Sequence, residues 1–90
     1  MRYRFEVSAP AQRQLARLPR VIQERIAKAV DEMERLEDSQ WSNVKALLGP
    51  AWKGRFRKKI GPYRVIFTKL PDIATAVISG ILIRSENTYK

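Results

Sequence analysis

The chain has 90 residues, of which 44% are hydrophobic, so we expect a single folded domain with a thin core spanning residues 1–90. It contains neither cysteine nor histidine, which excludes a disulfide, removes the usual zinc ligands and predicts a protein without metal or cofactor. Its formal net charge of +9 favours an anionic partner, such as nucleic acid, an anionic membrane surface or an acidic protein.

The first part of the chain predicts one strand followed by two helices. Residues 2–7 alternate polar and apolar side chains, which is typical of a half-buried strand. This start lacks the apolar stretch of a secretory signal, so we expect a cytoplasmic protein. Ser8 is suited to cap a short helix over residues 9–17. Apolar residues then recur at helical spacing over residues 20–36, which predicts an amphipathic second helix.

The remainder of the chain predicts three strands. Residues 43–50 are interpreted as a connector that covers the edge of the core. Residues 52–60 and 63–70 are interpreted as two strands joined by a turn at Gly61-Pro62. A nearly unbroken apolar strand follows over residues 73–83, far shorter than the ~20 residues of a membrane helix. We therefore predict an α+β fold in the order β-α-α-β-β-β, with a helical hairpin on one face of a small antiparallel sheet.

Positive charge is concentrated in the predicted hairpin. Between Ser39 and Pro71 the chain has no acidic residue. Because side chains alternate along a strand, positions 53, 55, 57 and 59 share a wholly cationic face, which Arg64 can join from beyond the turn. An ordinary solvated face mixes both signs of charge, so this pattern favours a surface that binds an anion. Trp41 and Trp52 are most simply explained by packing, with base stacking by Trp52 as an alternative.

Two segments resemble the RelE/ParE superfamily of bacterial toxin-antitoxin toxins. The stretch LLGPAWKGRFRKKIGPYRVIF is similar to the block of that family in which an aromatic residue precedes a basic strand and a Tyr-Arg pair. The ending RSENTY resembles the closing arginine and tyrosine of the family. The order of elements agrees over nearly the whole chain. The resemblance implies a RelE-like fold and a cognate antitoxin protein as partner.

RelE-type members enter the ribosomal A site and cleave mRNA there, using the ribose 2′-OH as nucleophile and no metal. Carried over by position, the resemblance implies that Arg64 stabilises the charge of the phosphorane, that Arg57 holds the scissile region, and that Tyr89 and Arg84 complete the catalytic group. The partners would then be the ribosome and mRNA. The candidate RNA-binding residues are Lys45, Lys53, Arg55, Lys58 and Lys59.

The chain also departs from the family pattern. Arg55 and Arg57 stand where well-studied RelE members have lysine, and an arginine cannot deprotonate a 2′-OH. Lys53, Lys59 and Tyr89 remain as candidate bases. Two alternative functions stay open. One is a ParE-like toxin that binds DNA gyrase, and the other is a non-catalytic RNA-binding module.

Overall fold

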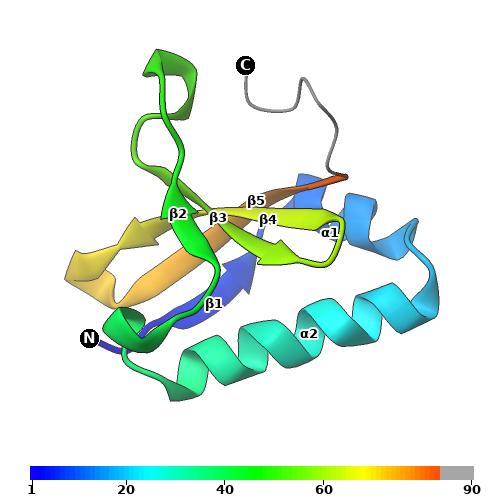
Figure 1. The fold of residues 1–90 in the computed structure, drawn as a ribbon, viewed down its shortest axis with the longest axis horizontal. Coiled ribbons are helices and arrows are strands. Elements are labelled where there is room, and N and C mark those ends of the chain that lie inside the picture. The colour runs from blue at the N-terminus through cyan, green and yellow to red at the C-terminus, as the bar shows by residue number, and fades with distance from the viewer. Residues whose placement is uncertain (84–90) are drawn as a thin grey trace.

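Two helices pack on one face of a five-stranded sheet in the computed structural model, which describes residues 1–83 (Figure 1). The strands lie in the order β1-β5-β4-β3-β2. The helices are α1 (Ala9–Ala16) and α2 (Arg20–Arg35). The strands are β1 (Arg4–Val7), β2 (Val44–Ala46), β3 (Arg55–Ile60), β4 (Tyr63–Leu70) and β5 (Thr75–Ile83). Short 3-10 turns occupy Asp38–Gln40, Pro50–Trp52 and Pro71–Ile73.

The α+β fold class is confirmed, and three details of the sheet differ from the prediction. The sheet is mixed rather than antiparallel, because β1 pairs with β5 in parallel. Part of the expected connector forms β2, which pairs with β3 and adds a fifth strand. The basic strand begins at Arg55 rather than at Trp52, because a 3-10 turn precedes it and Gly54 has a φ of 78°. A left-handed φ of this kind breaks the regular strand geometry.

Both helices begin where their capping residues predict. The Ser8 hydroxyl accepts a hydrogen bond from the Ala11 amide at 3.3 Å, which satisfies a free donor in the first turn of α1. Pro19 precedes α2 and separates it from α1. Ile26 and Met33 of α2 are buried against the sheet, as the helical spacing predicted. No helix within residues 1–83 is long and apolar enough to cross a membrane.

Phe67 of β4 lies at the centre of an aromatic cluster between the sheet and the helices. It is 0% exposed, and the rings of Phe5, Phe56 and Trp41 have their centroids 5.6 to 5.8 Å from its own. The Trp41 indole donates a hydrogen bond to the Met33 carbonyl at 2.9 Å, so its polar atom is satisfied within the protein. The predicted packing role of Trp41 is therefore confirmed.

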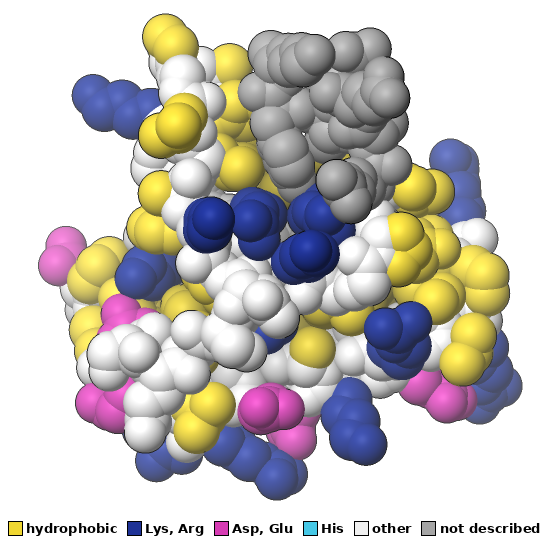
Figure 2. Space-filling view, in the orientation of Figure 1, with side chains coloured by type: hydrophobic (Ala, Val, Ile, Leu, Met, Phe, Trp, Pro, Cys, Tyr) yellow, Lys and Arg dark blue, Asp and Glu magenta, His cyan; other side chains and the backbone are white. Residues whose placement is uncertain are grey.

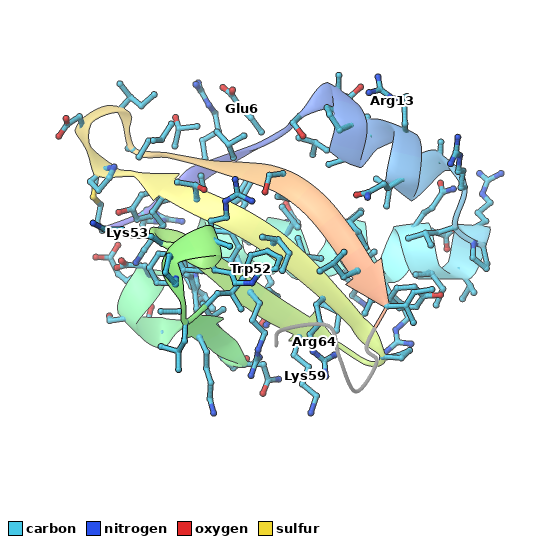
Figure 3. All side chains as sticks on the ribbon, turned by 90° about the horizontal axis from the view of Figure 1, so that it is seen from above. Glu6, Arg13, Trp52, Lys53, Lys59 and Arg64 are labelled. Atoms are coloured by element: carbon cyan, nitrogen blue, oxygen red, sulfur yellow. The ribbon has the colours of Figure 1, made fainter. Side chains whose placement is uncertain are left out.

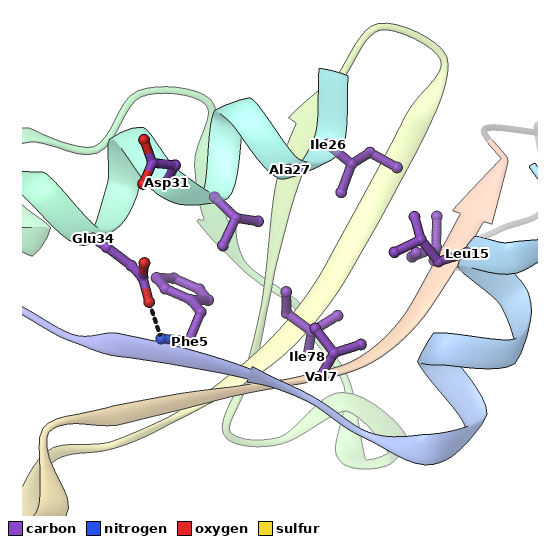
Figure 4. A pocket seen from close by; sticks show the side chains of 10 residues that line it. Phe5, Val7, Leu15, Ile26, Ala27, Asp31, Glu34 and Ile78 are labelled. Carbon is purple, nitrogen blue, oxygen red and sulfur yellow. Dashed lines mark hydrogen bonds between the residues drawn. The ribbon is translucent and has the colours of Figure 1, made fainter. Parts of the chain in front are cut away.

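An apolar groove of about 350 Å³ lies between α2 and β1 on the helix side of the sheet (Figure 4). The Glu34 carboxylate of α2 accepts a hydrogen bond from the Phe5 amide at 2.8 Å. It thereby covers an outward N–H group of the edge strand β1, which would otherwise be open to pairing with another chain. Among residues 1–83, the lining side chains include Asp31 and Glu34 but no cation, so this part of the groove is not suited to an anionic ligand.

Lys69 of β4 also lies on the helix side, where it reaches past the aromatic cluster to Asp38. Its ammonium is 3.2 Å from the Asp38 carboxylate and 4.7 Å from the centroid of the Phe56 ring. The hydrogen bond from Lys69 is the main reason why the pKa of Asp38 lies below its ordinary value of 3.8. The N-terminal ammonium, 3.2 Å away, lowers that pKa further.

Replacing Asp38 by asparagine is expected to destabilise the fold near neutral pH and to have less effect in acid. A lowered pKa means that the charged carboxylate stabilises the folded state above the unfolded pKa, and that this contribution disappears as the pH falls through the folded value. The difference between wild type and Asp38→Asn in urea midpoint should therefore narrow below about pH 3.8. Asp31→Asn, which removes an exposed partner of Arg35, serves as control. A constant difference from pH 6 to pH 3 would contradict the assignment.

Candidate nucleic-acid interface

The pairing of β2, β3 and β4 gathers five cations on the sheet face that points away from α2. Residues directly opposite each other on paired strands share a face. Lys45 lies opposite Arg57, and Lys59 lies opposite Arg64. Figure 2 shows lysine and arginine side chains gathered over these strands. The basic face, as we use the term below, consists of Lys45, Arg55, Arg57, Lys59 and Arg64.

Arg64 is the buried member of the basic face. Only 5% of it is exposed, and its Nη1 atom donates hydrogen bonds to the carbonyls of Gly61 at 2.9 Å and Tyr63 at 3.0 Å. The turn that holds it depends on Gly61, which has a left-handed φ of 58°. Because a guanidinium stays charged when it is buried, Arg64 is a permanent cation fixed in one position. Lys59 lies beside it at the end of the hairpin (Figure 3).

The other members of the basic face are at least partly accessible. Arg55, Lys59 and Lys45 are exposed, and Arg57 is half-buried. The Arg57 guanidinium donates a hydrogen bond to the Asn43 carbonyl at 3.1 Å. No member of the basic face forms an ion pair with a carboxylate among residues 1–83. The positive charge of this face is therefore uncompensated within the described part of the chain, and an anion bound there would relieve the repulsion.

Lys58 does not share the basic face, although it was grouped with the candidate RNA-binding residues. It is an even-numbered residue of β3, like Phe56 and Ile60, and these side chains point toward the helices. Its ammonium donates a hydrogen bond to the Ser42 carbonyl at 2.8 Å. Burial lowers the pKa of Lys58, and the charge of Glu32 on α2 partly opposes that shift. Lys58 therefore lies on the opposite face of β3 from Arg55, Arg57 and Lys59.

The remaining predicted site residues have different positions. Lys53 precedes β3 and lies at the end of the strand away from Lys59 (Figure 3). Arg84 and Tyr89 lie outside the described residues. Among residues 1–83 no group of three or more acidic side chains could hold a metal ion.

Sequence reasoning missed Asn43 as a contributor to this interface. The Asn43 carbonyl accepts the hydrogen bond that positions Arg57, and Asn43 itself has a left-handed φ of 57°. Asn is enriched in that conformation, so the Ser42-Asn43 pair was an available signal for a tight bend. The same carbonyl also accepts a hydrogen bond from the Lys59 amide at 2.9 Å, which joins the bend to β3.

The chain is similar to toxin-antitoxin toxins in both sequence and fold. A family model described as "ParE toxin of type II toxin-antitoxin system, parDE" matches residues 5–88. Among curated proteins, none matches the chain. The structure resembles the toxin-antitoxin complex RelBE2 from Mycobacterium tuberculosis, with a TM-score of 0.78 and 22% identity over 93% of this chain and 100% of that chain.

Two further solved structures have the same fold. The archaeal RelE-RelB complex from Pyrococcus horikoshii OT3 gives a TM-score of 0.76 and 24% identity, covering 96% of this chain and 99% of that chain. The isolated E. coli RelE toxin gives a TM-score of 0.70 and 18% identity, covering 93% of this chain and 88% of the RelE chain. At these identities the likeness establishes the fold.

Proposed function

Because the chain belongs to the RelE/ParE superfamily of type II toxin-antitoxin toxins, we propose that it inhibits translation by cleaving mRNA in the ribosomal A site. The observation that carries this proposal is the basic face, whose five cations come from three adjacent strands without a compensating carboxylate among residues 1–83. Such a face is suited to bind an RNA backbone, because its cations can neutralise successive phosphates. Arg64, buried and fixed, differs from the accessible cations around it.

The reaction proposed is attack by the ribose 2′-OH on the neighbouring phosphorus. A P–O2′ bond forms as the 2′-OH loses its proton, and the P–O5′ bond breaks as the leaving 5′ oxygen takes up a proton from water, which leaves a 2′,3′-cyclic phosphate and a 5′-hydroxyl. Negative charge develops on the non-bridging oxygens in the pentacovalent state, and a preorganised guanidinium stabilises that charge best. We assign this role to Arg64 and assign Arg57 and Arg55 to the phosphates on either side.

The proton of the 2′-OH must move to a group other than an arginine. Lys59 lies directly opposite Arg64 on the paired strand, and the resemblance to RelE-type toxins points to Tyr89. Arg84 is assigned by the same resemblance to the leaving 5′ oxygen. The variants Lys53→Arg, Lys59→Arg and Tyr89→Phe test the three candidate bases, because neither arginine nor phenylalanine can take the proton of the 2′-OH.

We further propose that a cognate antitoxin covers the basic face. Two of the similar structures are toxin-antitoxin complexes. An antitoxin segment rich in Asp and Glu would supply the carboxylates that the described residues do not place near Arg64 and Lys59. Bound there, it would also exclude RNA from the same surface.

Incubating the purified protein with programmed ribosomes and mapping mRNA 5′ ends tests the proposal. We expect new ends within the A-site codon that increase with time. A folded protein that produces no such ends, on ribosomes or on free mRNA, would remove the nuclease assignment.

One observation favours a second candidate function. The family model that matches residues 5–88 is that of ParE toxins, and the resemblance of this chain to ParE implies inhibition of DNA gyrase. A gyrase supercoiling assay separates the two functions, since a gyrase inhibitor blocks supercoiling and leaves mRNA intact. A plain RNA-binding module would bind RNA with a salt dependence and would be inactive in both assays.

A further inference from the structure

A shallow hollow of about 200 Å³ adjoins the basic face at Arg55. It brings together α1, β3, β4, β5 and the 3-10 turn that carries Trp52, which lies over the strands in Figure 3. The volume is below the ~300 Å³ at which pockets for drug-sized ligands begin, so the hollow suits a single ring system. The lining residues are Gln14, Trp52, Arg55, Ile66, Ser79, Gly80 and Leu82.

Apolar residues of β4 and β5 line one part of the hollow. Ile66 and Gly80 lie opposite each other on β4 and β5, and Leu82 follows on the same face of β5. Gly80 contributes no side chain there, and a Cβ atom added to it would lie 3.4 Å from the Gln14 Oε1 atom. The indole of Trp52 supplies a large aromatic surface beside these residues. A planar ring could therefore lie against Trp52 and the small residue at position 80.

Polar groups are placed at one end of the hollow. The Oε1 atom of Gln14 accepts a hydrogen bond from the Ile81 amide at 2.8 Å, which fixes the orientation of the side-chain amide. Its Nε2 atom has no hydrogen-bond partner among residues 1–83 and remains available as a donor. The Ser79 hydroxyl makes a long bond of 3.4 Å to the Ile66 carbonyl and keeps acceptor capacity. This combination of an aromatic wall and a polar edge is suited to a nucleobase.

The hollow and the basic face are continuous through Arg55, which belongs to both. Single-stranded RNA is bound by cations along its backbone and by aromatic side chains on which its bases stack. We propose that the hollow binds one nucleobase of the RNA whose phosphates lie on the basic face, with Trp52 as the stacking residue and Gln14 as a donor to the base edge. This inference rests on the proposed function in RNA cleavage.

The test uses the full chain and a fluorescent single-stranded RNA of about ten nucleotides, with affinity measured by anisotropy. Trp52→Ala is expected to weaken binding at least about fivefold, within the range for loss of one stacked base, and Trp52→Phe to weaken it less. An abasic nucleotide moved along the RNA should reduce binding by wild type at one position, and Trp52→Ala should remove that dependence. Leu48→Ala, an 86% exposed apolar residue near the same turn, is the control and should bind as wild type does.

The outcomes separate this inference from the proposed function. If wild type binds RNA but neither Trp52→Ala nor any abasic position changes the affinity, the nucleobase site is refuted and the basic face is retained. If the folded wild type binds no RNA, the nucleobase site is refuted, and the proposed cleavage is decided separately by mapping mRNA 5′ ends on programmed ribosomes. The abasic scan on wild type remains decisive even if Trp52→Ala proves unstable to urea.

A second variant tests whether Gln14 donates a hydrogen bond to the edge of the base. Gln14→Glu keeps an oxygen for the Ile81 amide but replaces the Nε2 donor by an acceptor. At the RNA position found in the abasic scan, the preference among the four bases should change about two- to tenfold, the effect of one hydrogen bond. Gln12→Glu adds the same charge to α1 at a residue whose amide binds the Val7 carbonyl instead. Unchanged preference in Gln14→Glu, or an equal change in both variants, would remove Gln14 from the site.

Discussion

Replacing Arg64 by alanine is expected to reduce mRNA cleavage at least about 100-fold, the scale for losing one donor to a transition state. Arg64 is 5% exposed and its guanidinium is held by two turn carbonyls, so it is already positioned before RNA binds. The guanidinium therefore does not have to move as the phosphorane forms. The rate at which new mRNA 5′ ends appear on programmed ribosomes measures the effect.

Two further variants separate the loss of charge from the loss of the guanidinium donors. Arg13→Ala removes the same charge from α1, away from the basic face, and should leave the rate nearly unchanged (Figure 3). Arg64→Lys keeps a charge but loses the fork of donors, so its rate should lie between those of wild type and Arg64→Ala. A folded Arg64→Ala protein that cleaves as fast as wild type would exclude Arg64 from the mechanism. Urea unfolding of each variant shows whether the loss of the two turn hydrogen bonds has changed the fold instead.

The basic face could be predicted largely from the sequence because strand geometry has a period of two. Once the chain turns at Gly61, the register of β3 and β4 follows, and it places Lys59 opposite Arg64. Odd-numbered residues of β3 then share a face whatever the surrounding fold is. The same rule places Lys58 on the opposite face, with Phe56 and Ile60.

The less predictable features depend on contacts between distant parts of the chain. β2 has only three residues, Val44–Ala46, which is too short for periodicity to identify a strand. The parallel pairing of β1 with β5 joins strands separated by most of the chain, and no local pattern specifies it. The hollow beside Arg55 likewise needs Gln14 from α1 and Gly80 from β5, which only the folded structure brings together.

Lys69 shows how charge counted along the sequence can mislead. It belongs to the segment of the sequence that has no acidic residue. In the structure it contacts Asp38, an acid just outside that segment, on the helix side of the sheet. Its ammonium also lies 4.7 to 5.7 Å from the ring centroids of Tyr3, Trp41 and Phe56. Its charge is thus compensated within the protein, unlike the charges of the basic face.

Replacing Phe67 by alanine is expected to lower the free energy of unfolding by about 3–5 kcal/mol, because it removes a fully buried ring and leaves a cavity. The rings of Phe5, Trp41 and Phe56 all contact this position, so the loss extends to β1, β3 and the segment that follows α2. For a domain of total stability of about 5–15 kcal/mol, this change brings the chain close to unfolding. Urea denaturation followed by circular dichroism measures it, with exposed Leu48→Ala expected to change stability by less than about 0.5 kcal/mol. A loss below about 1 kcal/mol for Phe67→Ala would mean that the aromatic cluster does not hold the sheet to α2, and that the basic face on its other side is supported by different contacts.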